Sequence, residues 1–120
     1  MDLAPILAAM AQDHDLAITL IASRDGLLVE GHGENAGEDL ESIAAGAARA
    51  LADLERMSKL VRGGNLARVR VSFDRYQLLI DPITEEDILV AGMGSGAGGE
   101  RLLDALAAYR KPLLAALRSL

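Results

Sequence analysis

The chain has 120 residues, of which 51% are hydrophobic and 25% are charged. At this length we expect one domain with a core large enough to fold unaided, and the apolar fraction argues against long disordered segments. The absence of cysteine excludes disulfide scaffolds, thiol nucleophiles and cysteine-ligated metal sites. A net charge of −6, with only two tyrosines and one phenylalanine, disfavours a nucleic-acid-binding surface.

No part of the sequence predicts a membrane span or a secretion signal. The longest apolar runs, such as residues 113–117, fall far short of the roughly 20 residues that a spanning helix requires. The first residues carry no early Lys or Arg and no continuous apolar stretch, unlike a secretory signal. We therefore expect a small, acidic, cytoplasmic protein.

Hydrophobic periodicity predicts eight elements in the order α-β-β-α-β-β-β-α. The predicted helices cover residues 3–11, 38–62 and 100–117, and the predicted strands cover residues 16–22, 27–30, 67–73, 76–81 and 88–93. Asp2 is expected to cap the first helix. Pro112 is expected to bend or break the last helix, because a proline removes a backbone hydrogen bond. Gly63, Gly64 and Asn65 are expected to end the long helix.

The strands predict an antiparallel sheet covered by helices on both faces. Residues 16–22 and 27–30 flank Ser23-Arg24-Asp25-Gly26, a turn whose glycine permits a tight hairpin. The strand at 16–22 is apolar on both of its alternating sides, which predicts helices on both faces of the sheet. Short connections favour antiparallel neighbours. The predicted fold class is therefore α+β, a single domain with a five-stranded antiparallel sheet sandwiched between helices.

The long helix at 38–62 carries two kinds of apolar surface. One arc at helical spacing holds the larger residues Ile43, Ala47, Ala50, Leu51, Leu54, Met57 and Val61. On the opposite arc, Ala44, Ala45, Ala48 and Ala52 stand where charged residues are expected. These alanines have two explanations of about equal weight. They are good helix formers that tolerate exposure, or they form an interface where a second backbone approaches closely.

Arg68, Arg70 and Ser72 alternate with Val69, Val71 and Phe73 on the strand at 67–73. Charged residues on one side of a strand are typical of an exposed sheet edge that must avoid aggregation. The same strand could also pair with its counterpart in a second copy, since a two-fold axis aligns identical strands antiparallel.

Three segments contain residue types that can bind a ligand or a metal. Residues 94–99 match G-x-G-x-x-G, but the chain offers only one helix afterwards and lacks the Lys-Ser/Thr pair of a phosphate-binding loop, so a plain connector is favoured. Asp13-His14-Asp15 with His32, and Glu85-Glu86-Asp87, lack the spacing of a metal site. No serine lies in a nucleophile context. We expect no catalytic residue, no cofactor and no metal.

The order of elements resembles the roadblock/LC7 family over nearly the whole chain. The resemblance rests on the short first helix, the hairpin around Ser23–Gly26, the alanine-rich helix from Ile43 to Leu54, the break at 63–65, and three closing strands before a final helix. It implies a profilin-like five-stranded sheet between helices. It also implies homodimers or heterodimers that form through the long second helix and the third strand.

By this resemblance, the predicted dimer interface consists of Ala44, Ala48, Ala52, Arg68, Arg70 and Ser72. The family acts without catalysis, as dynein light chains, Ragulator-type scaffolds and prokaryotic MglB-like regulators of Ras-like GTPases. The leading hypothesis is a dimeric adaptor that binds a small Ras-like GTPase and regulates it, GTPase activation being one form of that regulation. The alternative is a scaffold subunit whose protein partners bind regardless of nucleotide. A small-molecule-binding domain of the profilin or PAS kind would need a pocket over the sheet, and an enzyme is the last choice.

Overall fold

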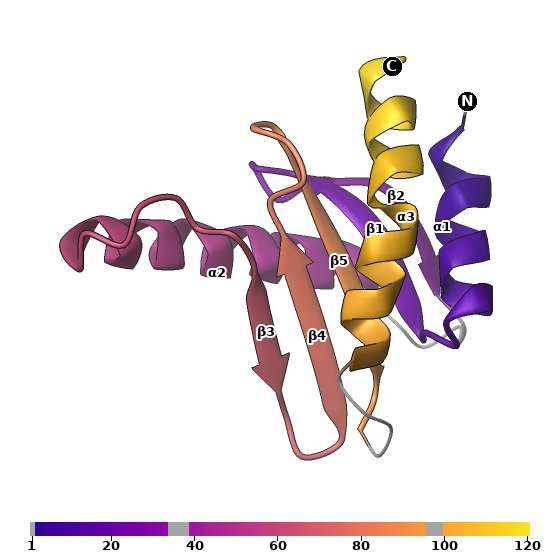
Figure 1. Cartoon of the computed structure of the whole chain (residues 1–120), viewed down its shortest axis with the longest axis horizontal. Coiled ribbons are helices and arrows are strands. Elements are labelled where there is room, and N and C mark those ends of the chain that lie inside the picture. Colours follow the sequence, from indigo (N-terminus) through magenta and orange to yellow (C-terminus); the bar gives the residue numbers. More distant parts are fainter. Residues whose placement is uncertain (1, 34–38, 96–99) are drawn as a thin grey trace.

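The computed structural model describes residues 2–33, 39–95 and 100–120. One antiparallel sheet in the order β2-β1-β5-β4-β3 has α1 and α3 on one face and α2 on the other (Figure 1). The elements are α1 (Leu3–Asp13), β1 (Ile18–Ser23), β2 (Leu28–Gly33), α2 (Leu40–Leu60), β3 (Val69–Ser72), β4 (Tyr76–Asp81), β5 (Asp87–Gly94) and α3 (Glu100–Arg118). The predicted fold class and element order are confirmed.

Strand β1 is buried on both faces, as its sequence predicted. Ile21 belongs to the core between the sheet and α1 and α3, whereas Leu20 and Ala22 belong to the core beneath α2. The two cores are separated by the sheet itself. The α1–α3 core also receives Leu7 and Leu102, which lie on the inward faces of the two helices.

Among the described residues, two buried polar side chains of the sheet, Thr19 and Asp81, each make a hydrogen bond to a helix. The Thr19 hydroxyl donates a hydrogen bond of 2.8 Å to the Leu7 carbonyl and so ties β1 to α1. Asp81, at the end of β4, is 1% exposed, and its Oδ1 accepts a 2.7 Å hydrogen bond from Arg110 Nη1. A buried carboxylate needs such a partner, so this pair fixes α3 against β4.

The ends of α1 and α2 agree only in part with the caps that their sequences predict. Asp39 caps α2 by accepting hydrogen bonds from the Ser42 hydroxyl and backbone N–H, and these bonds lower the pKa of Asp39. Asp2 occupies the N-cap position of α1, but its side chain makes no capping hydrogen bond, so that part of the prediction was wrong. At the other end of α2, positive φ values fall on Arg62, at 56°, and on Gly64, at 81°, so the left-handed backbone begins ahead of the predicted glycines and includes one of them.

Helix α3 continues through Pro112 from Glu100 to Arg118. The predicted local break is therefore absent. Gly26 does take the positive φ expected of the hairpin turn, at 90°. Within the described residues, none of the helices is long and apolar enough to cross a membrane.

Candidate functional site

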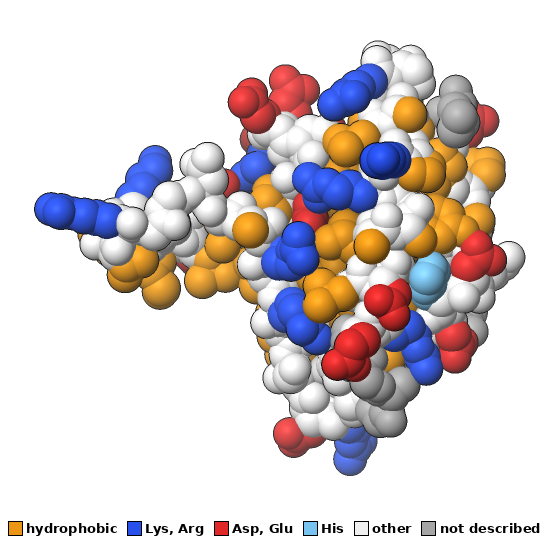
Figure 2. Space-filling model, viewed as in Figure 1, with side chains coloured by type: hydrophobic (Ala, Val, Ile, Leu, Met, Phe, Trp, Pro, Cys, Tyr) orange, Lys and Arg blue, Asp and Glu red, His pale blue; other side chains and the backbone are white. Residues whose placement is uncertain are grey.

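Helix α2 buries only one part of its apolar surface against the sheet. The residues that it buries are Ala44, Ala47, Ala48 and Leu51, all in its first four turns. Beyond them the helix projects past the sheet (Figure 1). Met57 and Val61 on this projecting part are 55% and 70% exposed, and Figure 2 shows hydrophobic side chains along it. Exposed apolar side chains gathered on one helix indicate a surface for protein contact.

An apolar groove lies beside this helix, over the strands at the sheet edge. Its volume is about 340 Å³. Its lining is entirely apolar. Helix α2 contributes Ile43, Gly46, Ala47 and Ala50, and β4 contributes Leu78 and Ile80. Val71 of β3 and Phe73, which directly follows β3, complete the lining. The groove has no charged or hydrogen-bonding side chain to orient a polar substrate, so it fits an apolar protein surface better than a metabolite.

The groove is bordered by the edge strand β3. Val69–Ser72 pair with β4 on one side, and no described strand pairs with the other side. Val71 faces the α2 side of the sheet, because it stands opposite Leu78 of the α2 core. An open edge next to an apolar groove offers both backbone and side-chain contacts to a second chain.

The predicted interface residues divide into two groups in the structure. Ala52, Arg68, Arg70 and Ser72 are exposed. Ala52 does not line the apolar groove and lies about 160° around α2 from Ala50, so it falls outside the interface proposed below. Ala44 and Ala48 are 0% and 7% exposed, because they face the sheet. Their assignment to the outer arc of the helix was wrong, and they have almost no surface to offer a partner.

The small residues of α2 do admit a close backbone, but it is the chain's own hairpin turn. A Cβ added at Gly26 would meet the Ala45 Cα at 3.2 Å and the Ala48 Cβ at 3.6 Å. A larger side chain at either helix position would push the β1–β2 turn away. The need for small residues therefore comes from folding of the single chain.

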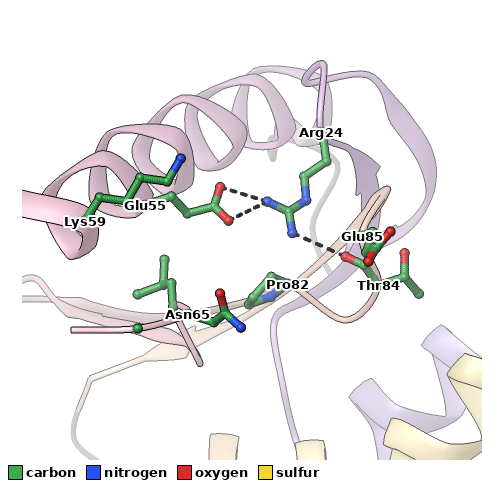
Figure 3. Close-up of a pocket in the computed structure, with 9 residues that line it drawn as sticks. Arg24, Glu55, Lys59, Asn65, Pro82, Thr84 and Glu85 are labelled. Carbon is green, nitrogen blue, oxygen red and sulfur yellow. Dashed lines mark hydrogen bonds and ion pairs between the residues drawn. The ribbon is translucent and has the colours of Figure 1, made fainter. Parts of the chain in front are cut away.

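A polar pocket of about 420 Å³ lies on the other side of α2 (Figure 3). Arg24 donates hydrogen bonds of 2.8 and 3.0 Å to the two carboxylate oxygens of Glu55, and one of 3.3 Å to the Thr84 carbonyl. These bonds join the hairpin turn, α2 and the β4–β5 loop. Since the central charges neutralise each other, this pocket is best explained as a structural contact.

The segments considered for metal binding serve as contacts between elements. The Tyr109 hydroxyl donates to the Asp13 carboxylate, which raises the pKa of Tyr109 above 10.0, and the His14 ring packs edge-on against the Tyr109 ring. Asp15 lies 3.5 Å from Arg101 Nη1. These contacts hold α1 to α3. Within residues 2–33, 39–95 and 100–120, no three metal-ligating side chains gather. Most of the glycine-rich motif at 94–99 lies outside the described residues.

The groove is not predicted by the sequence. Two of its lining residues, Ile43 and Ala50, belong to the predicted arc of larger residues, where the pattern indicates contact with the core. The sequence signal that could have indicated the groove is the width of the apolar surface of α2. Two apolar arcs on one helix exceed what a single sheet face covers.

A helix-flanked sheet with an apolar groove beside an open edge strand is typical of a domain that works through protein contacts. The Roadblock/LC7 domain model matches residues 5–92, and the chain belongs to this family. No curated protein sequence matches the chain.

Solved structures share the fold at low sequence identity. MglB from Myxococcus xanthus superposes with a TM-score of 0.86 at 15% identity, covering 100% of both chains. An MglB with a tetrameric arrangement gives 0.86 at 15% identity, covering 96% of this chain and 87% of that one. A roadblock/LC7 domain from Streptomyces avermitilis gives 0.81 at 24% identity, covering 98% and 99%. At these identities the similarity establishes the fold alone.

Proposed function

We propose that the protein is a homodimeric adaptor, assembled through α2 and β3, that binds a small Ras-like GTPase and regulates it. The observation that carries the proposal is the apolar groove beside the open edge of the sheet, in a chain of the roadblock/LC7 family. The protein acts through binding, and the proposal assigns it no catalytic residue.

A two-fold axis beside β3 would cover both unpartnered surfaces of the chain, the edge of β3 and the apolar groove. The two β3 strands would pair antiparallel and join the sheets, which removes the unpaired edge. The exposed part of one α2, with Met57 and Val61, would then cover the apolar groove of the other copy. A similar MglB is known in a tetrameric arrangement, which supports self-association in this fold.

Regulation of a GTPase would take place in trans. The sequence has no P-loop, since Glu100-Arg101 stands where that motif needs Lys-Ser/Thr. A bound adaptor can favour one arrangement of the partner's switch segments, and the arrangement that favours hydrolysis would make it an activator. The chain belongs to the roadblock/LC7 family and shares the fold of MglB, and the GTPase regulators that the family resemblance implies support this choice of partner.

The experiment compares binding to a Ras-like GTPase, sought first in the neighbouring reading frames, loaded with GDP or with a non-hydrolysable GTP analogue. Calorimetry with the wild-type protein is expected to show a clear preference for one nucleotide state. Ala50→Glu, which places a carboxylate in the groove, is expected to abolish both the dimer and this binding, and Ala52→Glu on the far side of α2 serves as the matched control. Binding that ignores the nucleotide would favour the alternative, a scaffold subunit.

A further inference from the structure

The face of the sheet opposite α2 carries an unusual set of basic residues. Arg70 stands opposite Leu79 in the β3–β4 register, and Leu79 belongs to the core beneath α1 and α3. Arg70 therefore points to the α3 side of the sheet. Arg68 immediately precedes β3, which begins at Val69. Both arginines are exposed.

The flank of α3 next to β4 continues this surface. Arg110 contacts Asp81 of β4, so its side of the helix faces the sheet edge. Leu103 lies on the same side, because it is seven residues from Arg110, and it is half-buried. Leu114 is also half-buried, but it lies beside the acidic β4–β5 turn with Glu85 and Glu86. The surface between α3 and β3 thus combines arginines with the apolar side chain of Leu103.

These cations are at odds with the net charge of the chain, which is −6. Figure 2 shows basic side chains gathered over α3 and the neighbouring strands β3 and β4. Among the described residues, neither Arg68 nor Arg70 has an ion pair. A positive surface maintained on an acidic protein indicates a negatively charged partner.

The proposed dimer would bring together the positive charges of Arg68 and Arg70 from two copies. Antiparallel pairing of the β3 strands brings Arg68 and Arg70 of both copies to the two-fold axis. They would form the floor of a trough between the two α3 helices. Like charges on facing strands weaken strand pairing, so the dimer is more stable when an anion lies over the arginines.

We propose that this trough binds an acidic segment of a partner protein, and that the bound segment strengthens the dimer. The inference rests on the dimer of the proposed function. Guanidinium groups bind carboxylates with forked hydrogen bonds, and Leu103 would contact an apolar side chain of the same segment.

The shape of the site favours a protein segment over a membrane or a nucleic acid. The arginines lie at the level of the sheet, so flanking helices of about 10 Å diameter hold a flat bilayer away from them. Asp104 is exposed on the outer side of α3, where a bilayer would make first contact. A net charge of −6 per chain also opposes the dense phosphates of DNA or RNA.

The first test measures binding of a short fluorescent Glu/Leu peptide by anisotropy at protein concentrations that keep the dimer intact. The double variant R68Q/R70Q removes the floor of the trough. R49Q/K59Q removes the same charge from exposed positions of α2 and is the matched control. We expect the first variant to weaken binding about tenfold or more and the control to leave it unchanged.

The second test measures the dimer dissociation constant by sedimentation at low salt. Neutralising Arg70 changes the net charge from −6 to −7, so general repulsion between acidic copies predicts a weaker dimer. Local repulsion in the trough predicts the opposite. We expect R70Q to tighten the dimer about two- to fivefold and R49Q not to do so. The peptide should tighten the wild-type dimer as well, by linkage.

Three results would overturn the inference: equal peptide binding by both double variants, a weaker R70Q dimer, or stronger binding to phosphatidylserine vesicles or duplex DNA than to the peptide. A wild-type protein that stays monomeric would overturn the proposed function itself. The two failures are therefore distinguishable, because a monomeric wild-type protein contradicts the dimer itself, whereas the other three results are obtained with an intact dimer.

Discussion

Three neighbouring alanines of α2 test the arrangement of this helix, because a glutamate at each has a different expected outcome. Ala48 faces the sheet and is 7% exposed. Ala50 lines the apolar groove. Ala52 is exposed and lies about 160° around the helix from Ala50. Glutamate is a good helix former, so intrinsic helix propensity changes little at any of them.

At Ala48, the new carboxylate enters the core beneath the hairpin turn, where Gly26 leaves no spare room. An unpaired buried charge costs about 3–5 kcal/mol, a large part of the 5–15 kcal/mol typical of a whole domain. We expect Ala48→Glu to unfold or nearly unfold the protein.

At Ala50, the carboxylate reaches solvent in the single chain but is buried in the dimer. Fold stability should change by about 0.5 kcal/mol or less, while dimerisation should weaken by about 3 kcal/mol, or roughly a hundredfold. Ala52→Glu should change neither property.

The assay combines circular dichroism in urea with analytical ultracentrifugation. A folded Ala48→Glu monomer would contradict the assignment of Ala48 to the core. An Ala52→Glu monomer beside a dimeric Ala50→Glu would contradict the groove as the interface.

The remaining predictions concern the core, the hairpin turn and the contact between α1 and α3. Leu51→Ala should lower the free energy of unfolding by about 2–5 kcal/mol in urea denaturation, because Leu51 is fully buried, and a loss below about 1 kcal/mol would count against this packing. Gly26→Ala should cost about 1–3 kcal/mol in the same assay, because it combines positive φ with the close Ala45 backbone, and an unchanged midpoint would refute the close approach. The raised pKa of Tyr109 means that its contact with Asp13 contributes stability below pH 10.0, and this contribution is lost as the pH rises through the folded-state pKa. Asp13→Asn should move the NMR-detected pKa of Tyr109 down, and an unmoved titration would disprove the hydrogen bond as its cause.

The sequence predicted much of the fold because its signals are local. The alternation of Arg70 and Ser72 with the two valines correctly separated the two faces of β3. The apolar run at 16–22 correctly indicated a strand covered on both faces. Each of these signals depends on residues within a single strand.

The orientation of α2 could not be predicted in this way. Alanine fits both a core and a surface, so periodicity alone could not say which apolar arc faces the sheet. Contacts distant in sequence decide it: the Gly26 turn packs against Ala45 and Ala48, and Arg24 binds Glu55. The groove needs the placement of α2 against β3 and β4, which no local pattern contains.

The central claim is that two copies meet at β3, and spin-label distances test it most directly. The chain has no cysteine, so labels can be placed at Ser72→Cys near the proposed axis or at Val29→Cys on the opposite edge strand β2. In a joined sheet of ten strands, the β3 strands lie about 5 Å apart and the β2 strands about 43 Å apart. We predict a short intermolecular distance for Ser72→Cys and a long one for Val29→Cys. The reverse order, or no intermolecular distance at either site, would contradict the account.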